Sequence, residues 1–216
     1  MSTSEDREAA FIGKITAGAT HELRNVLAIV KESAGLIADL VRSSDKPGTS
    51  RADKLMRAVG RIEDQVKRGS ELLTNLNRFA HSLDHAEDET DLSDVARQVS
   101  FLCQRVARKG RHLVEAQPGE ENLTVVVNLL RLQMALHAAV ECCLEQLPEG
   151  GRLTLQPIRH GDRPALEFAG EVEGEAVRFV PTEAAGWSGL AAVLEVLGAS
   201  LEQSEATPGF RLTLSG

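Results

Sequence analysis

The sequence predicts an α+β protein built in two parts. The first is a long antiparallel helical hairpin, which we expect to form a dimeric four-helix bundle, and the second is a small α/β sandwich. Apolar residues recur at helical spacing, without a proline, from Ser4 to Val41 and again from about Arg51 to Leu83. Farther along, short alternating runs typical of strands are separated by apolar helical segments. We therefore expect one domain over residues 1–86 and another over 87–216.

The charge and composition of the chain argue against a nucleic-acid partner. Hydrophobic residues make up 42% and charged residues 26% of the 216 residues, as in ordinary globular proteins. The formal net charge is −8, whereas a phosphate backbone attracts a basic surface. No stripe of Arg and Lys interleaved with aromatic residues offsets this charge, so we expect no binding to nucleic acid.

The N-terminus and the cysteines favour a cytoplasmic protein. The first ten residues are polar and acidic, unlike a secretory signal, and no apolar stretch approaches the roughly 20 residues that a membrane span needs. The cysteines are Cys103, Cys142 and Cys143, an odd number with two of them adjacent. This pattern fits buried free thiols in a reducing compartment better than disulfides or a metal site.

The apolar stripe of the first helix predicts that His21 points into water. With about 100° of rotation per residue, the apolar residues fall on the face opposite His21. They are Ile12, Ile15, Ala19, Leu23, Val26, Leu27, Val30, Ala34 and Ile37. Small and polar residues share the face of His21, namely Lys14, Ala17, Gly18, Asn25, Ala28 and Glu32. Periodicity alone leaves open whether His21 is functional or a plain surface histidine.

The second helix carries an apolar stripe of its own. A loop is expected over Ser43–Ser50, where Pro47-Gly48 is a turn signal. The stripe that follows consists of Leu55, Val59, Ile62, Val66, Leu72, Leu73, Leu76 and Phe79. Because a two-helix hairpin cannot enclose both stripes by itself, we expect a homodimer.

The second half of the chain predicts an antiparallel sheet covered by helices on one side. His85–Asp91 is expected to be a linker, and Asp91 or Ser93 to cap the next helix. The expected helices are Leu92–Val106, Leu129–Leu147 and Leu190–Leu197. The expected strands are His112–Ala116, Leu123–Val127, Arg152–Ile158, Ala165–Phe168, Val177–Val180, a strand near Leu201, and Phe210–Leu214. Pro208-Gly209 favours a hairpin between the last two strands.

One run of the first helix resembles the phosphoacceptor motif of sensor histidine kinases, which reads His-Glu-Leu-Arg-Thr/Asn-Pro. That run is Thr20-His21-Glu22-Leu23-Arg24-Asn25. The segments FIGKITAGAT and ELLTNLNRFAH are similar to the dimerisation hairpin of these kinases. Three later segments are similar to their ATP-binding domain: TDLSDVARQVSFLCQRVARKG, RLQMALHAAVECCLEQLPEGGRLTL and GWSGLAAVLEVLGASLEQSEATPGFRLTLSG. The resemblance thus spans nearly the whole chain in the family's order.

The resemblance implies roles for four residues. A neutral imidazole nitrogen of His21 would take a phosphoryl group, and an aspartate of a receiver domain would have to reach it. Glu22 would accept a hydrogen bond from the other ring nitrogen. Arg24 would meet phosphate or a partner carboxylate, and Asn25 would orient a water molecule or the partner's phosphoryl group. Val26 stands where the family has proline, so the helix should run straight past His21.

The nucleotide site that the resemblance implies is eroded in this sequence. Alignment on Pro148–Gly151 puts Ala138 and Cys142 at the positions of two asparagines, and neither residue offers a hard oxygen ligand for Mg²⁺. The expected adenine loop after Phe168 reads Ala169–Gly174, without an aspartate and with two glutamates that would repel phosphate. The lid is short, and Gly186–Leu190 alone is similar to the final glycine motif. We therefore expect neither ATP nor Mg²⁺ as a cofactor, and any Mg²⁺ would come with the receiver partner.

These observations lead to one main hypothesis and two alternatives. The main hypothesis is a histidine phosphotransferase of a two-component phosphorelay, which passes a phosphoryl group between receiver aspartates through His21. The first alternative is a non-catalytic pseudokinase that binds receivers as a regulator. The second is a divergent ATP-dependent sensor histidine kinase, or a phosphatase that uses Asn25.

Overall fold

The computed structural model of the chain describes residues 3–42, 49–84, 86–119, 123–204 and 208–214. Two compact units make up the chain. The first, the hairpin unit, is Ala9–Arg78. The second, the sheet unit, combines Met1–Glu8 with Phe79–Gly216. No helix in the described part of the chain is long and apolar enough to cross a membrane.

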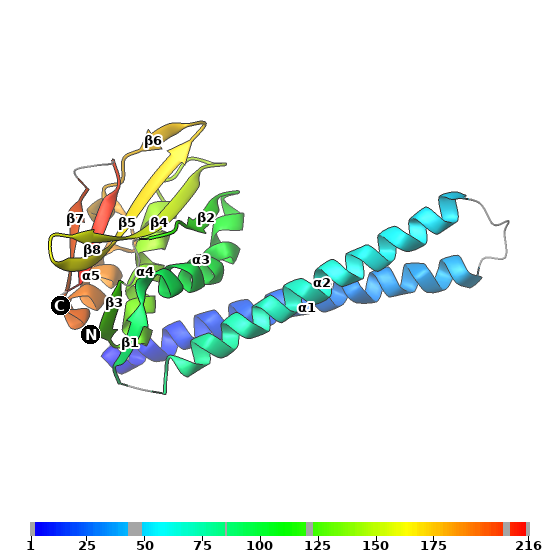
Figure 1. The fold of residues 1–216 in the computed structure, drawn as a ribbon, viewed down its shortest axis with the longest axis horizontal. Coiled ribbons are helices and arrows are strands. Elements are labelled where there is room, and N and C mark those ends of the chain that lie inside the picture. The colour runs from blue at the N-terminus through cyan, green and yellow to red at the C-terminus, as the bar shows by residue number, and fades with distance from the viewer. Residues whose placement is uncertain (1–2, 43–48, 85, 120–122, 205–207, 215–216) are drawn as a thin grey trace. The chain divides into compact units, whose positions relative to one another are not determined.

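Two long antiparallel helices form the hairpin unit, as the sequence predicts (Figure 1). They are α1 (Ser4–Arg42) and α2 (Thr49–His81), and most of the loop expected between them lies outside the described residues. The helices approach closely where a Cβ built on Gly69 of α2 would lie 3.3 Å from Val26 Cγ1 of α1. A larger residue at position 69 would therefore push Val26 aside.

The burial along α1 differs in part from the expected stripe. The buried residues of the helix are Phe11, Ile15, Glu22, Val26 and Ser33, at intervals of four and seven. Leu27, which the pattern placed on the buried face, is 66% exposed in the single chain. Glu22, a charged residue, is buried instead. Within the single chain, the residues of α1 that are buried thus form a narrower stripe than the apolar residues of the helix.

A six-stranded sheet forms the framework of the sheet unit. Its order is β2-β4-β5-β8-β7, with β6 paired to β5. The strands are β2 (Leu113–Ala116), β4 (Arg152–His160), β5 (Arg163–Val172), β6 (Glu175–Val177), β7 (Ala199–Gln203) and β8 (Phe210–Leu214). The expectation of an antiparallel sheet is wrong for one pair, because β2 runs parallel to β4. A parallel pair needs a long crossover, and α4 lies in the segment that connects these two strands.

The expected linker over His85–Asp91 is partly wrong. Its second half is a strand, β1 (Asp88–Asp91), which pairs antiparallel with β3 (Thr124–Val127) in a separate two-stranded sheet. The acidic residues Asp88 and Glu89 stay exposed in this strand. The strand could not be predicted from these polar residues, because it forms by pairing with β3, more than thirty residues away.

Three helices pack on one side of the sheet (Figure 1). They are α3 (Leu92–Lys109), α4 (Leu129–Leu144) and α5 (Trp187–Leu197). Asp91 accepts a hydrogen bond from the Ser93 N–H at 2.6 Å and so caps α3. In the core beneath them, the rings of Phe168 and Phe210 stack with centroids 4.6 Å apart. The three cysteines are free and buried, as expected.

Candidate functional site

His21 lies in the middle of α1, and its side chain is exposed, in the phase that the apolar stripe predicts. Its nearest described polar partner is one turn farther along the helix. The Nδ2 atom of Asn25 lies 3.3 Å from His21 Nδ1. Residues four apart share one face of a helix, so the helix itself holds this amide beside the ring.

Glu22 turns away from this exposed face and into the hairpin. Only 8% of the residue is exposed, and its Oε2 atom lies 2.6 Å from Nη2 of Arg68 on α2. Adjacent helix positions differ by about 100°, so an exposed His21 and a buried Glu22 are compatible. The structure therefore brings Asn25 to His21 and brings Glu22 to Arg68.

Arg68 is the residue of this site that sequence reasoning missed. It lies next to Gly69, where the two helices approach closely, and it is half-buried. A buried carboxylate requires a cation, and the second helix has to supply it at the same level of the hairpin. A charged residue on the buried line of α1 is the sequence signal that could have found it. Arg24, the fourth expected site residue, is exposed on α1.

The hairpin site offers an exposed nucleophile, the imidazole of His21. This imidazole can approach a phosphorus atom carried by another molecule, since it is exposed among the residues of the hairpin that the structure describes. Among the described residues, no group of three or more His, Cys, Asp or Glu side chains is placed to hold a metal ion.

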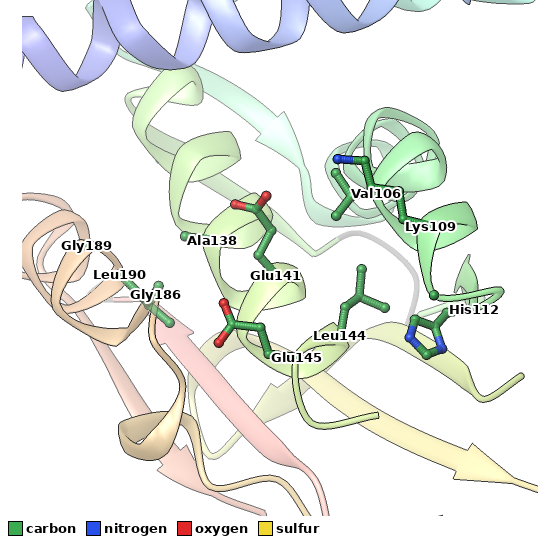
Figure 2. A pocket seen from close by; sticks show the side chains of 11 residues that line it. Val106, Lys109, His112, Ala138, Glu141, Leu144, Glu145, Gly186, Gly189 and Leu190 are labelled. Carbon is green, nitrogen blue, oxygen red and sulfur yellow. The ribbon is translucent and has the colours of Figure 1, made fainter. Parts of the chain in front are cut away.

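A second feature is a pocket of about 490 Å³ in the sheet unit, between α3, α4 and the start of α5 (Figure 2). Ala138 and Gly186 line it, at positions that the resemblance assigns to the nucleotide site. Figure 2 shows the carboxylate of Glu145 pointing toward the α5 side, with Glu141 farther along α4, while Lys109 and His112 lie on the α3 side. The two carboxylates are four residues apart and therefore neighbours on α4.

The end of α4 holds the segment that leads into α5. The Ala185 N–H donates to Glu145 Oε2 at 2.8 Å, and the Val180 N–H donates to Gln146 Oε1 at 2.8 Å. Glu145 therefore already accepts the N–H of Ala185, two residues before α5 begins, so this N–H is not open to a bound anion. Cys142 is buried, with its Sγ atom 3.4 Å from a Cβ built on Gly186.

His137 adds a buried charged group beside the pocket. Burial by itself would lower the pKa of this imidazole, but the Cys103 sulfur and the Glu141 carboxylate outweigh it and raise the pKa to about 9. The His137 Nδ1 atom lies 3.4 Å from Glu141 Oε2. The imidazole is therefore charged at neutral pH and offsets the charge of Glu141.

The adenine loop expected over Ala169–Gly174 is not a loop. Strand β5 continues to Val172, and Glu173 and Gly174 form the turn to β6 with φ values of 53° and 84°. Two positive φ values in succession are typical of a tight hairpin turn. The strand extends because Gly170 leaves room for the Phe179 ring, with which a Cβ at position 170 would collide. The strand expected at Val177–Val180 is displaced to β6, because pairing resumes directly after this turn.

Comparisons with known proteins give matches among solved structures. No protein-family model matches the chain, and no curated protein matches it. A bacterial phosphotransferase is 14% identical over 96% of this chain and 97% of its own, with a TM-score of 0.50. The histidine kinase AdeS of Acinetobacter baumannii is 17% identical over 90% and 97% of the two chains, with a TM-score of 0.46. Histidine kinase ThkA in complex with the response regulator protein TrrA is 18% identical over 98% and 63%, with a TM-score of 0.43. At these identities, the likeness to the phosphotransferase is one of fold.

Proposed function

We propose that the chain is a histidine phosphotransferase of a two-component phosphorelay. It accepts a phosphoryl group from the aspartyl phosphate of one receiver domain on His21 and passes it to the aspartate of another. The observation that carries this proposal is the exposed His21 in the middle of a long helical hairpin, with the Asn25 amide 3.3 Å from its ring. The resemblance of the surrounding sequence and the likeness in fold to a bacterial phosphotransferase support it.

The proposed chemistry needs what the hairpin provides. A phosphoryl group held on an aspartate of another protein requires an exposed nucleophile, so that the attacking nitrogen, the phosphorus and the leaving aspartate oxygen can lie in line. His21 is such a nucleophile because its face of α1 carries small and polar residues. Arg24 is exposed on the same segment, and in this proposal it would meet the acidic surface around a phosphorylated aspartate.

We also propose that two copies of the chain pair through their hairpins in the cytoplasm. Apolar residues remain exposed at intervals of seven on α2, namely Val59, Val66 and Leu73, and Leu27 and Val41 are exposed on α1. Residues spaced by seven form one continuous seam along a helix, as in helices that pack in a bundle. A second hairpin with the same seams is the simplest surface that would cover them.

In this proposal the pocket beside α4 takes no Mg-ATP. Ala138 and Cys142 offer no oxygen ligand for Mg²⁺. The carboxylates of Glu141 and Glu145 would repel phosphate groups, and Glu145 already accepts the N–H of Ala185. The phosphoryl group would then come from a receiver domain, together with the Mg²⁺ that such a domain holds.

The test uses purified receiver domains from the organism that encodes this chain, each charged with radiolabelled phosphate. The chain is mixed with each of them, and label on the chain is read after gel electrophoresis. We expect acid-labile, alkali-stable label on the wild type that His21→Gln abolishes. The matched control is His81→Gln, which changes another exposed helical histidine and should keep the label.

Other outcomes separate the alternatives. Receivers that bind the chain but leave no label on it would favour a regulator without chemistry. A parallel incubation and calorimetric titration with Mg-ATP tests the kinase alternative. Label from ATP that disappears in His21→Gln would contradict the proposed source of the phosphoryl group.

A further inference from the structure

The contact between Asn25 and His21 bears on which ring nitrogen is the nucleophile. A neutral imidazole carries one proton, on either Nδ1 or Nε2, and only the nitrogen without the proton has a lone pair for attack. The amide of Asn25 faces Nδ1, the ring nitrogen nearer the backbone. Its NH₂ end can donate only to an unprotonated Nδ1, whereas its oxygen can accept only from a protonated Nδ1.

The two orientations of the Asn25 amide favour different tautomers of the His21 ring. Asn25 Nδ2 lies 3.3 Å from Nδ1, and a hydrogen bond in this orientation requires that Nδ1 accept and that Nε2 carry the proton. A half-turn of the amide exchanges its two ends at nearly the same position. Asn25 Oδ1 would then accept from Nδ1–H, and the lone pair of Nε2 would point outward.

Glu22, the carboxylate that the resemblance implies as hydrogen-bond partner of the His21 ring, contacts Arg68 instead. Glu22 is buried, and its Oε2 atom lies 2.6 Å from Arg68 Nη2 inside the hairpin. Moving it to the ring of His21 would leave the half-buried guanidinium without this partner. Asn25 needs no such exchange, because it lies on the same exposed face as the ring.

We propose that Asn25 is a positioning residue that sets the tautomer of His21, so that a turn of its amide makes Nε2 the nucleophile. This inference rests on the proposed phosphotransferase function and adds the residue that decides which ring nitrogen of His21 attacks. The lone pair of Nε2 attacks the phosphorus of a receiver's aspartyl phosphate, and the N–P bond forms as the P–O bond to the aspartate breaks. The aspartate leaves as a carboxylate with the bonding electron pair. The proton on Nδ1 stays in place, hydrogen-bonded to Asn25 Oδ1.

The experiment measures the tautomer and the rate in the same full-length variants. Nitrogen-15 NMR of the His21 ring in mildly alkaline buffer reports which nitrogen carries the proton. The variants are Asn25→Asp, whose carboxylate can only accept, and Asn25→Ala, which removes the contact. The control is Asn75→Ala on α2, where the amide donates to its own helix at Glu71 O. Label transfer from a phosphorylated receiver is timed for wild type and for the two Ala variants.

We expect Asn25→Asp to move the proton toward Nδ1 and Asn25→Ala to shift the tautomer balance away from that of the wild type. Asn25→Ala should also slow transfer about fivefold, the effect of one net hydrogen bond, while Asn75→Ala changes neither quantity. A slower transfer with an unchanged tautomer would overturn the inference, because Asn25 would then act on the phosphoryl group or on water. An unchanged rate and tautomer would overturn it as well. Failure of the wild type to accept label would refute the phosphotransferase proposal itself.

Discussion

Arg68 and Glu22 form an ion pair across the helical hairpin, with Nη2 and Oε2 2.6 Å apart. Glu22 directly follows His21 in the sequence. The side chain of Glu22 is 11% exposed and that of Arg68 is 39% exposed. The carboxylate is therefore largely withdrawn from water, and the Arg68 guanidinium compensates part of the cost of burying its charge. The pair ties α1 to α2 at the level of the candidate nucleophile, and it does so without occupying the exposed face.

Removal of Arg68 should destabilise the hairpin. In Arg68→Met the Glu22 carboxylate stays buried without its cation, and we expect unfolding to become easier by about 2 kcal/mol, below the range for a fully buried pair because Arg68 is partly exposed. Urea denaturation followed by helical circular dichroism measures the change. Arg42→Met is the matched control, since its pair with Asp39 is 80% and 79% exposed, and we expect less than about 0.5 kcal/mol. Equal effects of the two substitutions would show that the buried pair contributes no more than the exposed one.

Charges placed in the exposed apolar seam should separate the dimer. Val66 and Leu73 are each 55% exposed in the single chain, and the double variant Val66→Glu/Leu73→Glu would lose four apolar contacts per dimer. At about 1 kcal/mol each, dimerisation should weaken about a thousandfold. Light scattering at micromolar concentration should give two 23.3 kDa chains for the wild type and one for the variant. Thr74→Glu, at an exposed polar neighbour, should stay dimeric, and a monomeric wild type would refute the proposed dimer.

Loss of the Glu145 carboxylate should loosen the segment before α5. Glu145→Ala removes the acceptor of the Ala185 N–H, a charge-assisted hydrogen bond worth about 1.5 kcal/mol. We expect the amide of Ala185 to exchange its hydrogen faster, while the amides of the central sheet keep their rates. Glu149→Ala provides the control, because that carboxylate is 66% exposed in its pair with Arg111. Unchanged exchange at Ala185 would show that other contacts hold the segment.

The charged His137 should make the sheet unit less stable in alkali. Its pKa is about 9 in the folded protein against an ordinary 6.5, so the folded state binds the proton more tightly than the unfolded state. The stabilisation is fully present below about pH 6.5 and is lost as the pH rises through about 9. Thermal denaturation between these limits should show a falling Tm. In Glu141→Gln, which removes one cause of the raised pKa, the fall should be smaller, and an equal fall would assign it to other groups.

The sequence predicted the parts of the fold that depend on local periodicity. Both long helices follow from apolar residues at 3.6-residue spacing, and the exposure of His21 follows from the phase of the first stripe. Residues such as Asp91, whose side chain caps α3, could also be identified, because a cap bonds to a neighbour in the sequence.

Pairings between distant segments could not be predicted in the same way. Strand β1 is acidic, and it becomes a strand because β3 lies beside it. The partnership of Glu22 with Arg68 spans 46 positions and depends on how the two helices face each other. A pattern within one helix gives the direction of a side chain, whereas its partner is fixed by packing.

Relay from one receiver to another tests the central proposal most directly. A receiver charged with radiolabelled phosphate is mixed with an uncharged second receiver, and the chain is added either as wild type or as His21→Gln. We predict that label reaches the second receiver only through the wild type, because His21 holds the phosphoryl group between the two aspartates. Equal transfer in the presence of His21→Gln, or no transfer with the wild type across all receiver pairs, would contradict the proposed phosphotransferase.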